Sequence, residues 1–69
     1  MLITIEDHNL VADFCVHYRR SGFVVERFAG GVVEVTRPDA PTAEQSRREV
    51  ELHLLVWQAV NPDTGIRCE

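Results

Sequence analysis

Lysine is absent from this sequence, and none of its segments is strongly basic. All seven basic residues are arginines, scattered from Arg19 to Arg67 among eleven acidic residues, so the net charge is -4. Proteins that bind nucleic acids need clustered basic side chains to neutralise phosphates. The composition therefore predicts that the chain has no nucleic-acid partner.

Long apolar runs are missing as well. No stretch approaches the roughly 18 to 20 apolar residues that cross a bilayer. The first residues, MLITIEDHN, carry acids where a secretion signal has a basic start and a longer apolar segment. We therefore expect a cytoplasmic protein without a membrane partner.

Cysteine is scarce: only Cys15 and Cys68 occur, without a CxxC motif, so we expect no disulfide framework. Cys15 instead fits a helical apolar pattern as a small core residue. The 69 residues suffice for a single domain, 1–69. A domain of this size buries only about 60% of its unfolded surface and often gains stability from a disulfide, a metal or a partner chain.

Hydrophobic periodicity and capping signals predict five elements and leave a sixth open. The five are a strand at 2–5, a helix from the N-cap Asp7 to the closing Gly22, strands at 23–28 and 32–37, and a helix from the N-cap Thr42 to Asn61. After a turn that follows Pro62, residues 66–68 either form a short last strand or stay outside the sheet. The segment TAEQ is a capping box, in which the Thr42 hydroxyl accepts from the Gln45 amide and the Gln45 side chain reaches back.

The segment AGG joins the second and third strands, and a three-residue loop over 29–31 places Val25 opposite Val35. This register gathers one apolar face, which consists of Phe23, Val25, Val33 and Val35. It also places Glu26 opposite Glu34, where two carboxylates repel each other and could perform acid–base chemistry.

The element order β-α-β-β-α(-β) predicts an α+β domain, in which a small antiparallel sheet carries both helices on one face. This is the ferredoxin-like, or split βαβ, arrangement with a short or missing last strand. The arrangement hosts many functions and selects none. RNA binders of this type stack bases on aromatic side chains in the central strands, and the segments LITI and GVVEVTR contain none.

Metal and catalytic motifs are also missing. Asp13 with His17, and Glu49 with His53, are spaced four apart on the helices and could each hold an ion, but HxxxH, HExxH and CxxC are absent. No serine or cysteine lies in a GxSxG motif, and His8 is expected in a solvated loop. We therefore predict no metal, no cofactor and no catalytic residue.

The segment VELHLLVWQAV, residues 50–60, is apolar on two sides. At about 100° per residue, Leu54 and Trp57 lie within roughly 40° of Val50, together with Ala43 one further turn back. We expect this side, Trp57 included, to pack on the sheet. The opposite side must be covered by the first helix, by the C-terminal tail or by another molecule.

This second side of the helix is the predicted interface, and a two-fold homodimer is its expected use. It consists of Leu52, Leu55, Val56 and Ala59. The open face of the sheet offers another apolar surface, which consists of Leu2, Val24, Phe28 and Val32.

The sequence thus predicts a small non-enzymatic module that binds protein, as a homodimer or as an accessory to a larger partner. The first alternative is a metabolite-sensing domain with a ligand at the sheet face or subunit seam. The second is a small enzyme that uses Glu26 and Glu34.

Overall fold

The computed structural model describes residues 1–62 and 64–68. Its elements are strand β1 (Leu2–Ile5), the 3₁₀ turn η1 (His8–Leu10), helix α1 (Val11–Arg20), strand β2 (Val24–Arg27), the 3₁₀ turn η2 (Ala29–Gly31), strand β3 (Val32–Thr36), helix α2 (Ala43–Val60) and strand β4 (Ile66–Cys68). The five predicted helices and strands are present, and the last strand, which the sequence left open, forms as well. The turn expected after Pro62 includes residue 63, which lies outside the described residues.

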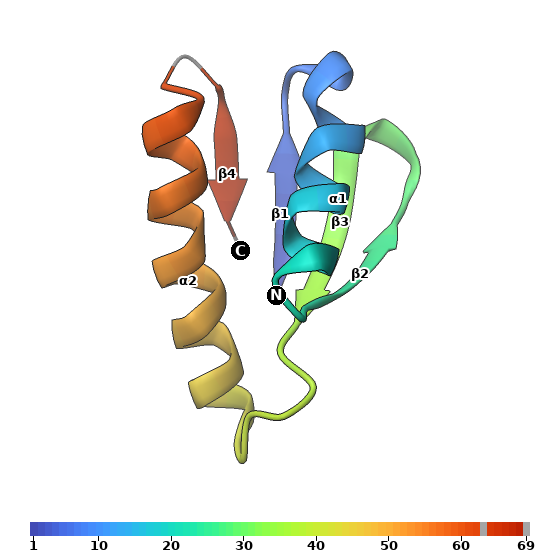
Figure 1. Ribbon diagram of the computed structural model, residues 1–69. Helices are drawn as coiled ribbons and strands as arrows, with labels where there is room; N and C mark the ends of the chain where they lie inside the picture. The colour runs from blue at the N-terminus through green and yellow to red at the C-terminus, as the bar shows by residue number, and fades with distance from the viewer. Residues whose placement is uncertain (63, 69) are drawn as a thin grey trace.

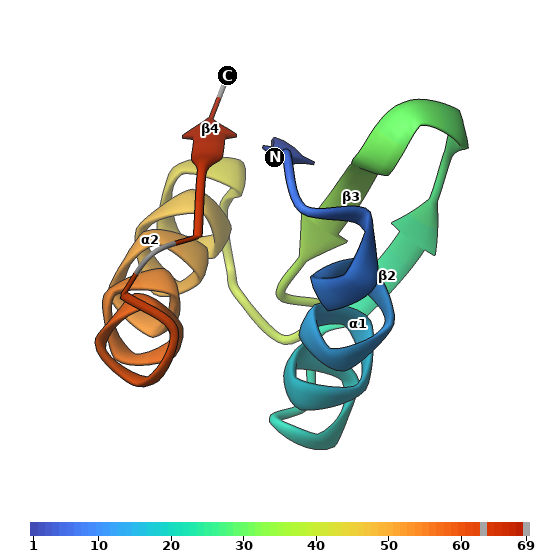
Figure 2. The same cartoon turned by 90° about the horizontal axis from the view of Figure 1, so that it is seen from above.

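The four strands form one antiparallel sheet in the order β2-β3-β1-β4. Both helices lie on the same side of this sheet, with α1 beside β2 and β3 and α2 beside β4 (Figure 2). The predicted α+β architecture with both helices on one face is thus confirmed. In Figure 1, α2 stands at one edge of the molecule and spans the full height of the sheet.

The hairpin between β2 and β3 has the predicted register. Val25 pairs with Val35, and Glu26 pairs with Glu34. The loop requires glycine, because Gly30 and Gly31 have φ angles of 75° and 77°, a region that side chains with a Cβ rarely adopt. A Cβ on Gly31 would also lie only 2.5 Å from the carbonyl oxygen of Ile5.

The core lies between the inner face of the sheet and both helices. Its buried side chains are Ile3, Ile5, Val11, Phe14, Cys15, Tyr18, Phe23, Val25, Val33, Val35, Val50, Leu54 and Trp57. The ring of Phe14 stacks on Tyr18 at a centroid distance of 4.4 Å and meets Trp57 edge-on at 5.2 Å. Trp57 is 3% exposed, so its predicted place in the core is confirmed.

One buried hydrogen bond joins the two helices. The Tyr18 hydroxyl donates to the carbonyl oxygen of Val50 over 3.1 Å. Burial raises the pKa of Tyr18 well above its ordinary value, and the charge of the Cys68 thiolate adds to this effect. The hydroxyl therefore stays protonated at neutral pH and remains a donor.

Thr42 caps α2 as predicted, since its hydroxyl accepts a hydrogen bond from the Gln45 amide. Asp7 accepts from the Asn9 amide and caps the 3₁₀ turn η1 instead of the first α-helix. Helix α1 begins only at Val11, after an N-cap residue, Leu10, whose side chain makes no capping hydrogen bond. Ala43 departs from the prediction, because it is exposed. The first turn of α2 extends below the sheet (Figure 1), so Ala43 borders an open hollow beside Met1 and Thr36.

The chain reaches ordinary monomer compactness by itself. Its accessible surface is 4416 Å², and a folded monomer of 7.8 kDa exposes about 4,400 Å². A partner is therefore not required to collapse the chain.

We expect Trp57→Ala to lower the free energy of unfolding by about 3 to 5 kcal/mol, because it removes a large side chain from between α1 and α2. Trp57→Phe keeps the edge-on contact with Phe14 and should lose far less. Urea unfolding followed by circular dichroism measures both. An unchanged midpoint for Trp57→Ala would show that the two faces of α2 have been assigned wrongly.

Candidate functional site

The side of α2 that faces away from the core is apolar and uncovered. We call it the outer patch of α2, and it consists of Leu52, Leu55, Val56, Ala59 and Val60. Leu52 is 58% exposed, Leu55 64%, Val56 56% and Val60 74%. The intramolecular alternative, in which α1 or the C-terminal tail covers this side, is therefore wrong for the described residues.

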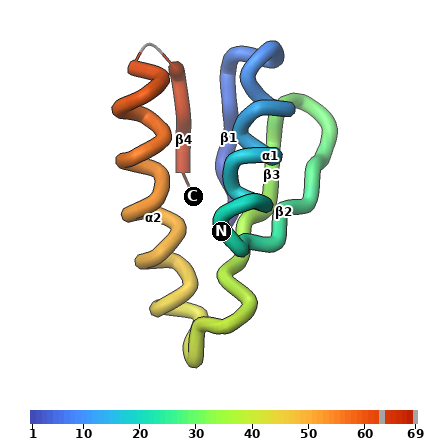
Figure 3. Tube along the Cα trace, in the orientation of Figure 1, coloured from blue at the N-terminus to red at the C-terminus, as the bar shows by residue number. Residues whose placement is uncertain are grey.

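The spacing along the sequence creates this patch. Residues 52, 55, 56, 59 and 60 follow the i, i+3, i+4, i+7, i+8 pattern of an amphipathic helix. Val50, Leu54 and Trp57 meanwhile point the other way and are buried. In Figure 3, α2 forms one margin of the molecule and no described segment runs along its outer side. The second half of α2 is thus apolar on two sides, of which one is buried and the other exposed.

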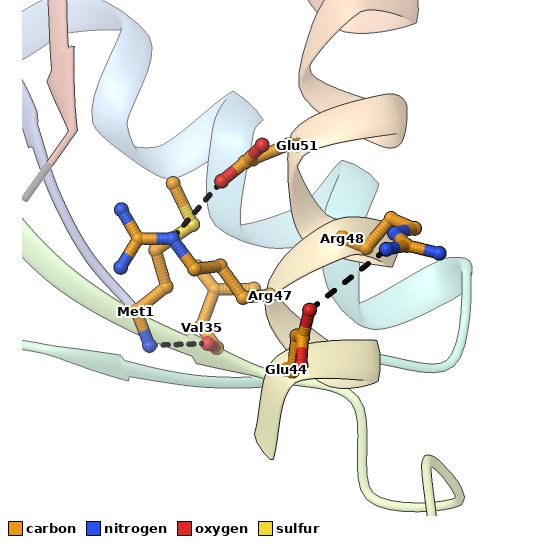
Figure 4. Close-up of polar contacts among 6 residues, drawn as sticks. All are labelled: Met1, Val35, Glu44, Arg47, Arg48 and Glu51. Carbon is orange, nitrogen blue, oxygen red and sulfur yellow. Dashed lines mark hydrogen bonds and ion pairs between the residues drawn. The ribbon is translucent and has the colours of Figure 1, made fainter. Parts of the chain in front are cut away.

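Toward the start of α2, the helix face that carries the outer patch continues with a charged residue. Arg48 lies one turn before Leu52, and its guanidinium is 3.9 Å from the Glu44 carboxylate, with both side chains largely exposed. Arg47 lies on the other side of the helix, toward Met1, and pairs with Glu51 at 3.0 Å (Figure 4). The last turn of α2 carries no basic residue. The outer patch therefore has a cation at one end and, at the other, a helix C-terminus that carries no basic residue.

A histidine pair lies between α1 and α2 beside the outer patch. The rings of His17 and His53 meet with centroids 4.7 Å apart. The Nε2 atom of each is buried and has no hydrogen-bond partner among the described residues. His53 also contacts the ring of Phe23 at 5.2 Å, and the Arg37 guanidinium lies 4.9 Å above that same ring.

The sequence did not predict this contact. It suggested Asp13–His17 and Glu49–His53 pairs, and no ion pair joins either of them in the described part of the chain. An i, i+4 spacing identifies neighbours on one helix. His17 and His53 instead lie on two different helices and are 36 positions apart in the sequence. Only the way α1 and α2 pack on the sheet brings the two imidazoles together.

The histidine environment favours neutral imidazole. Burial lowers the pKa of His53, and the positive charges of His17 and Arg37 lower it further. A hollow beside His53 is lined by Glu49, Leu52 and Val56, so the imidazole borders the outer patch. On the α1 side, His17 shares a second hollow with Asp13 and Arg20.

The other candidate sites lie apart from this region. Glu26 and Glu34 face each other on the open side of the sheet, and both are exposed. Val24 and Phe28 are half-exposed on that same side. Cys15 is buried in α1 and Cys68 is exposed on β4, both as free thiols.

Within residues 1–62 and 64–68, no three His, Cys, Asp or Glu side chains are grouped so that they could hold a metal ion. None of the helices in the same residues has the length and apolarity to cross a membrane. Comparison with protein families, characterised proteins and solved structures finds no match. The role of the outer patch must therefore be argued from its own residues.

We expect acid to destabilise the protein through His53. Because the folded-state pKa of His53 is lowered, the unfolded chain binds more protons than the folded chain once the pH falls below the ordinary value of about 6.5. The stabilising contribution is complete above that value and is lost as the pH drops through the lower folded-state pKa. Urea titrations between about pH 5 and pH 8 measure this slope.

The control is a second histidine. His53→Gln should flatten the slope in this window, whereas His8→Gln, at an exposed position, should leave it as in the wild type. Equal slopes for the wild type and His53→Gln would contradict the prediction.

Proposed function

We propose that this chain is a small non-enzymatic protein-interaction module and that the outer patch of α2 is its contact surface. The observation that carries the proposal is the exposure of four large aliphatic side chains along one helix face of a 69-residue chain. Contiguous apolar patches on small proteins commonly mark sites of protein contact.

The composition of the patch supports a protein as the ligand. Aliphatic side chains occupy its centre, and the charged Glu44, Arg48 and Glu49 lie around its end. Protein interfaces have this arrangement of an apolar centre and a polar rim. Each leucine fully buried in such a contact contributes about 1.5 to 3 kcal/mol to binding. A small polar metabolite on an open surface would not bury these leucines and would not gain this binding energy.

The fold that surrounds the outer patch supports the same proposal. We infer that it is a ferredoxin-like, split βαβ arrangement, since the strand order β2-β3-β1-β4 places β3 between the two strands that α1 connects. Both helices pack on one side, so the outer side of α2 is left free by the architecture. The fold does not indicate the identity of the partner.

Photo-crosslinking in the source cell tests the contact surface. A photoreactive amino acid at position 55 should give covalent protein adducts, and the additional substitution Leu52→Glu should abolish them by placing a charge in the patch. The matched control is position 47, where the Arg47 side chain is also exposed but lies on the side of α2 that faces Met1. Equal labelling at 47 and 55, or adducts that survive Leu52→Glu, would refute the proposal.

A further inference from the structure

We propose that the partner of the outer patch is a second copy of this chain, whose α2 packs antiparallel across a two-fold axis between Leu55 and Val56. This inference rests on the proposed function, because it names the occupant of the same surface. Three features of α2 support it: the sizes of the facing side chains, the placement of charge and the extent of the patch.

The first feature is size. A two-fold axis between Leu55 and Val56 places Leu52 against the partner's Ala59, and Leu55 against the partner's Val56. Each large side chain then meets a smaller one, which allows close packing of two helices. A parallel pair would place Leu52 against the partner's Leu52 and Ala59 against the partner's Ala59, so the two helices would be held apart at one end.

The second feature is charge. Arg48 is 7.5 residues from the proposed axis and the last residue of α2, Val60, is 4.5 residues from it. At 1.5 Å per residue, Arg48 therefore lies roughly 4 to 5 Å beyond the end of the partner's helix. The carbonyl groups at the C-terminal end of a helix carry partial negative charge, which a guanidinium stabilises.

No basic residue in the last turn of α2 already supplies that stabilisation. Arg48 is also available for the contact, since its own pairing with Glu44 is long, at 3.9 Å, and both side chains are exposed. In a parallel pair, Arg48 would instead face the partner's Arg48, and like charges would repel. Charge and size thus favour the same orientation.

The third feature is extent. A stable dimer of standard size buries about 800 Å² of surface on each chain. Five aliphatic side chains on a single helix bury less surface than this. Since the chain is already as compact as a folded monomer, the copies should fold first and then associate. We therefore expect a reversible dimer with a dissociation constant in the micromolar range.

Light scattering behind a sizing column tests whether the partner is a second copy of this chain. The mass should rise from 7.8 kDa toward twice that value as the concentration is raised from micromolar to millimolar. Leu55→Glu should keep the mass at that of one chain, because the substitution places charges on both sides of the axis. A circular dichroism spectrum equal to that of the wild type ensures that this variant is a folded monomer.

Cysteine pairs test the orientation in a Cys68→Ser background. Leu52→Cys and Ala59→Cys chains, mixed and oxidised, should form a covalent dimer, whereas each variant alone should not. In the antiparallel pair, position 52 lies about 10 Å along the axis from its own symmetry mate, too far for a disulfide. Self-disulfides in the single variants without a product in the mixture would overturn the proposed orientation.

The two neighbouring arginines of α2 provide the matched charge test. Arg48→Glu should weaken the dimer about tenfold, because two symmetric contacts with helix ends become repulsive. Arg47→Glu changes the net charge equally on the side of α2 that faces Met1 (Figure 4) and should leave the dissociation constant unchanged. Equal effects of both variants would remove the role assigned to Arg48.

The outcomes separate this inference from the proposed function. A constant mass of 7.8 kDa at millimolar concentration, together with adducts to other proteins at position 55, would refute the proposal that the partner is a second copy. The outer patch would then remain a protein-binding surface. The loss of position-specific adducts would overturn both.

Discussion

The contact between Tyr18 and α2 holds this small domain together. The Tyr18 ring stacks on Phe14 within α1, and its hydroxyl donates to the Val50 carbonyl of α2. Phe14 in turn meets Trp57 edge-on. These contacts draw both helices onto one face of the sheet, where they enclose the core. A buried hydroxyl needs a partner, so the position of Val50 also fixes how far α2 can slide along α1.

This one-sided packing explains why several large apolar side chains stay exposed. With both helices on one face, none of the described segments covers the opposite face of the sheet or the outer side of α2. Valines and leucines that a larger domain would bury therefore remain exposed, since a chain of this length has too much surface for its volume. A second protein can remove that surface from water without changing the fold. Small domains commonly gain stability by association for this reason.

The histidine pair adds a chemical constraint beside the same surface. His17 and His53 approach each other because α1 and α2 pack side by side, and no carboxylate among the described residues forms an ion pair with either ring. Burial and nearby positive charge lower the pKa of His53, so the packed arrangement favours neutral imidazole. The helix packing that exposes the outer patch thus also makes its border sensitive to protons.

Local rules determined most of the fold. Alternation predicted the strands, Thr42 predicted the start of α2, and the two-sided pattern of residues 50–60 predicted the burial of Trp57. The pairing of Val25 with Val35 followed from a three-residue loop that gathers the apolar side chains of both strands on one face. Each of these features depends on residues close together in the chain, where spacing and steric preference act directly.

Only the tertiary structure decided which side chains meet across elements. It brought His17 to His53, turned Arg37 onto Phe23 and left Ala43 beyond the edge of the core. It also showed that neither α1 nor the described part of the tail covers the outer patch. A helix pattern reports how many sides are apolar but not which neighbour reaches each side, because that depends on the relative placement of distant segments and on the surface they bury together.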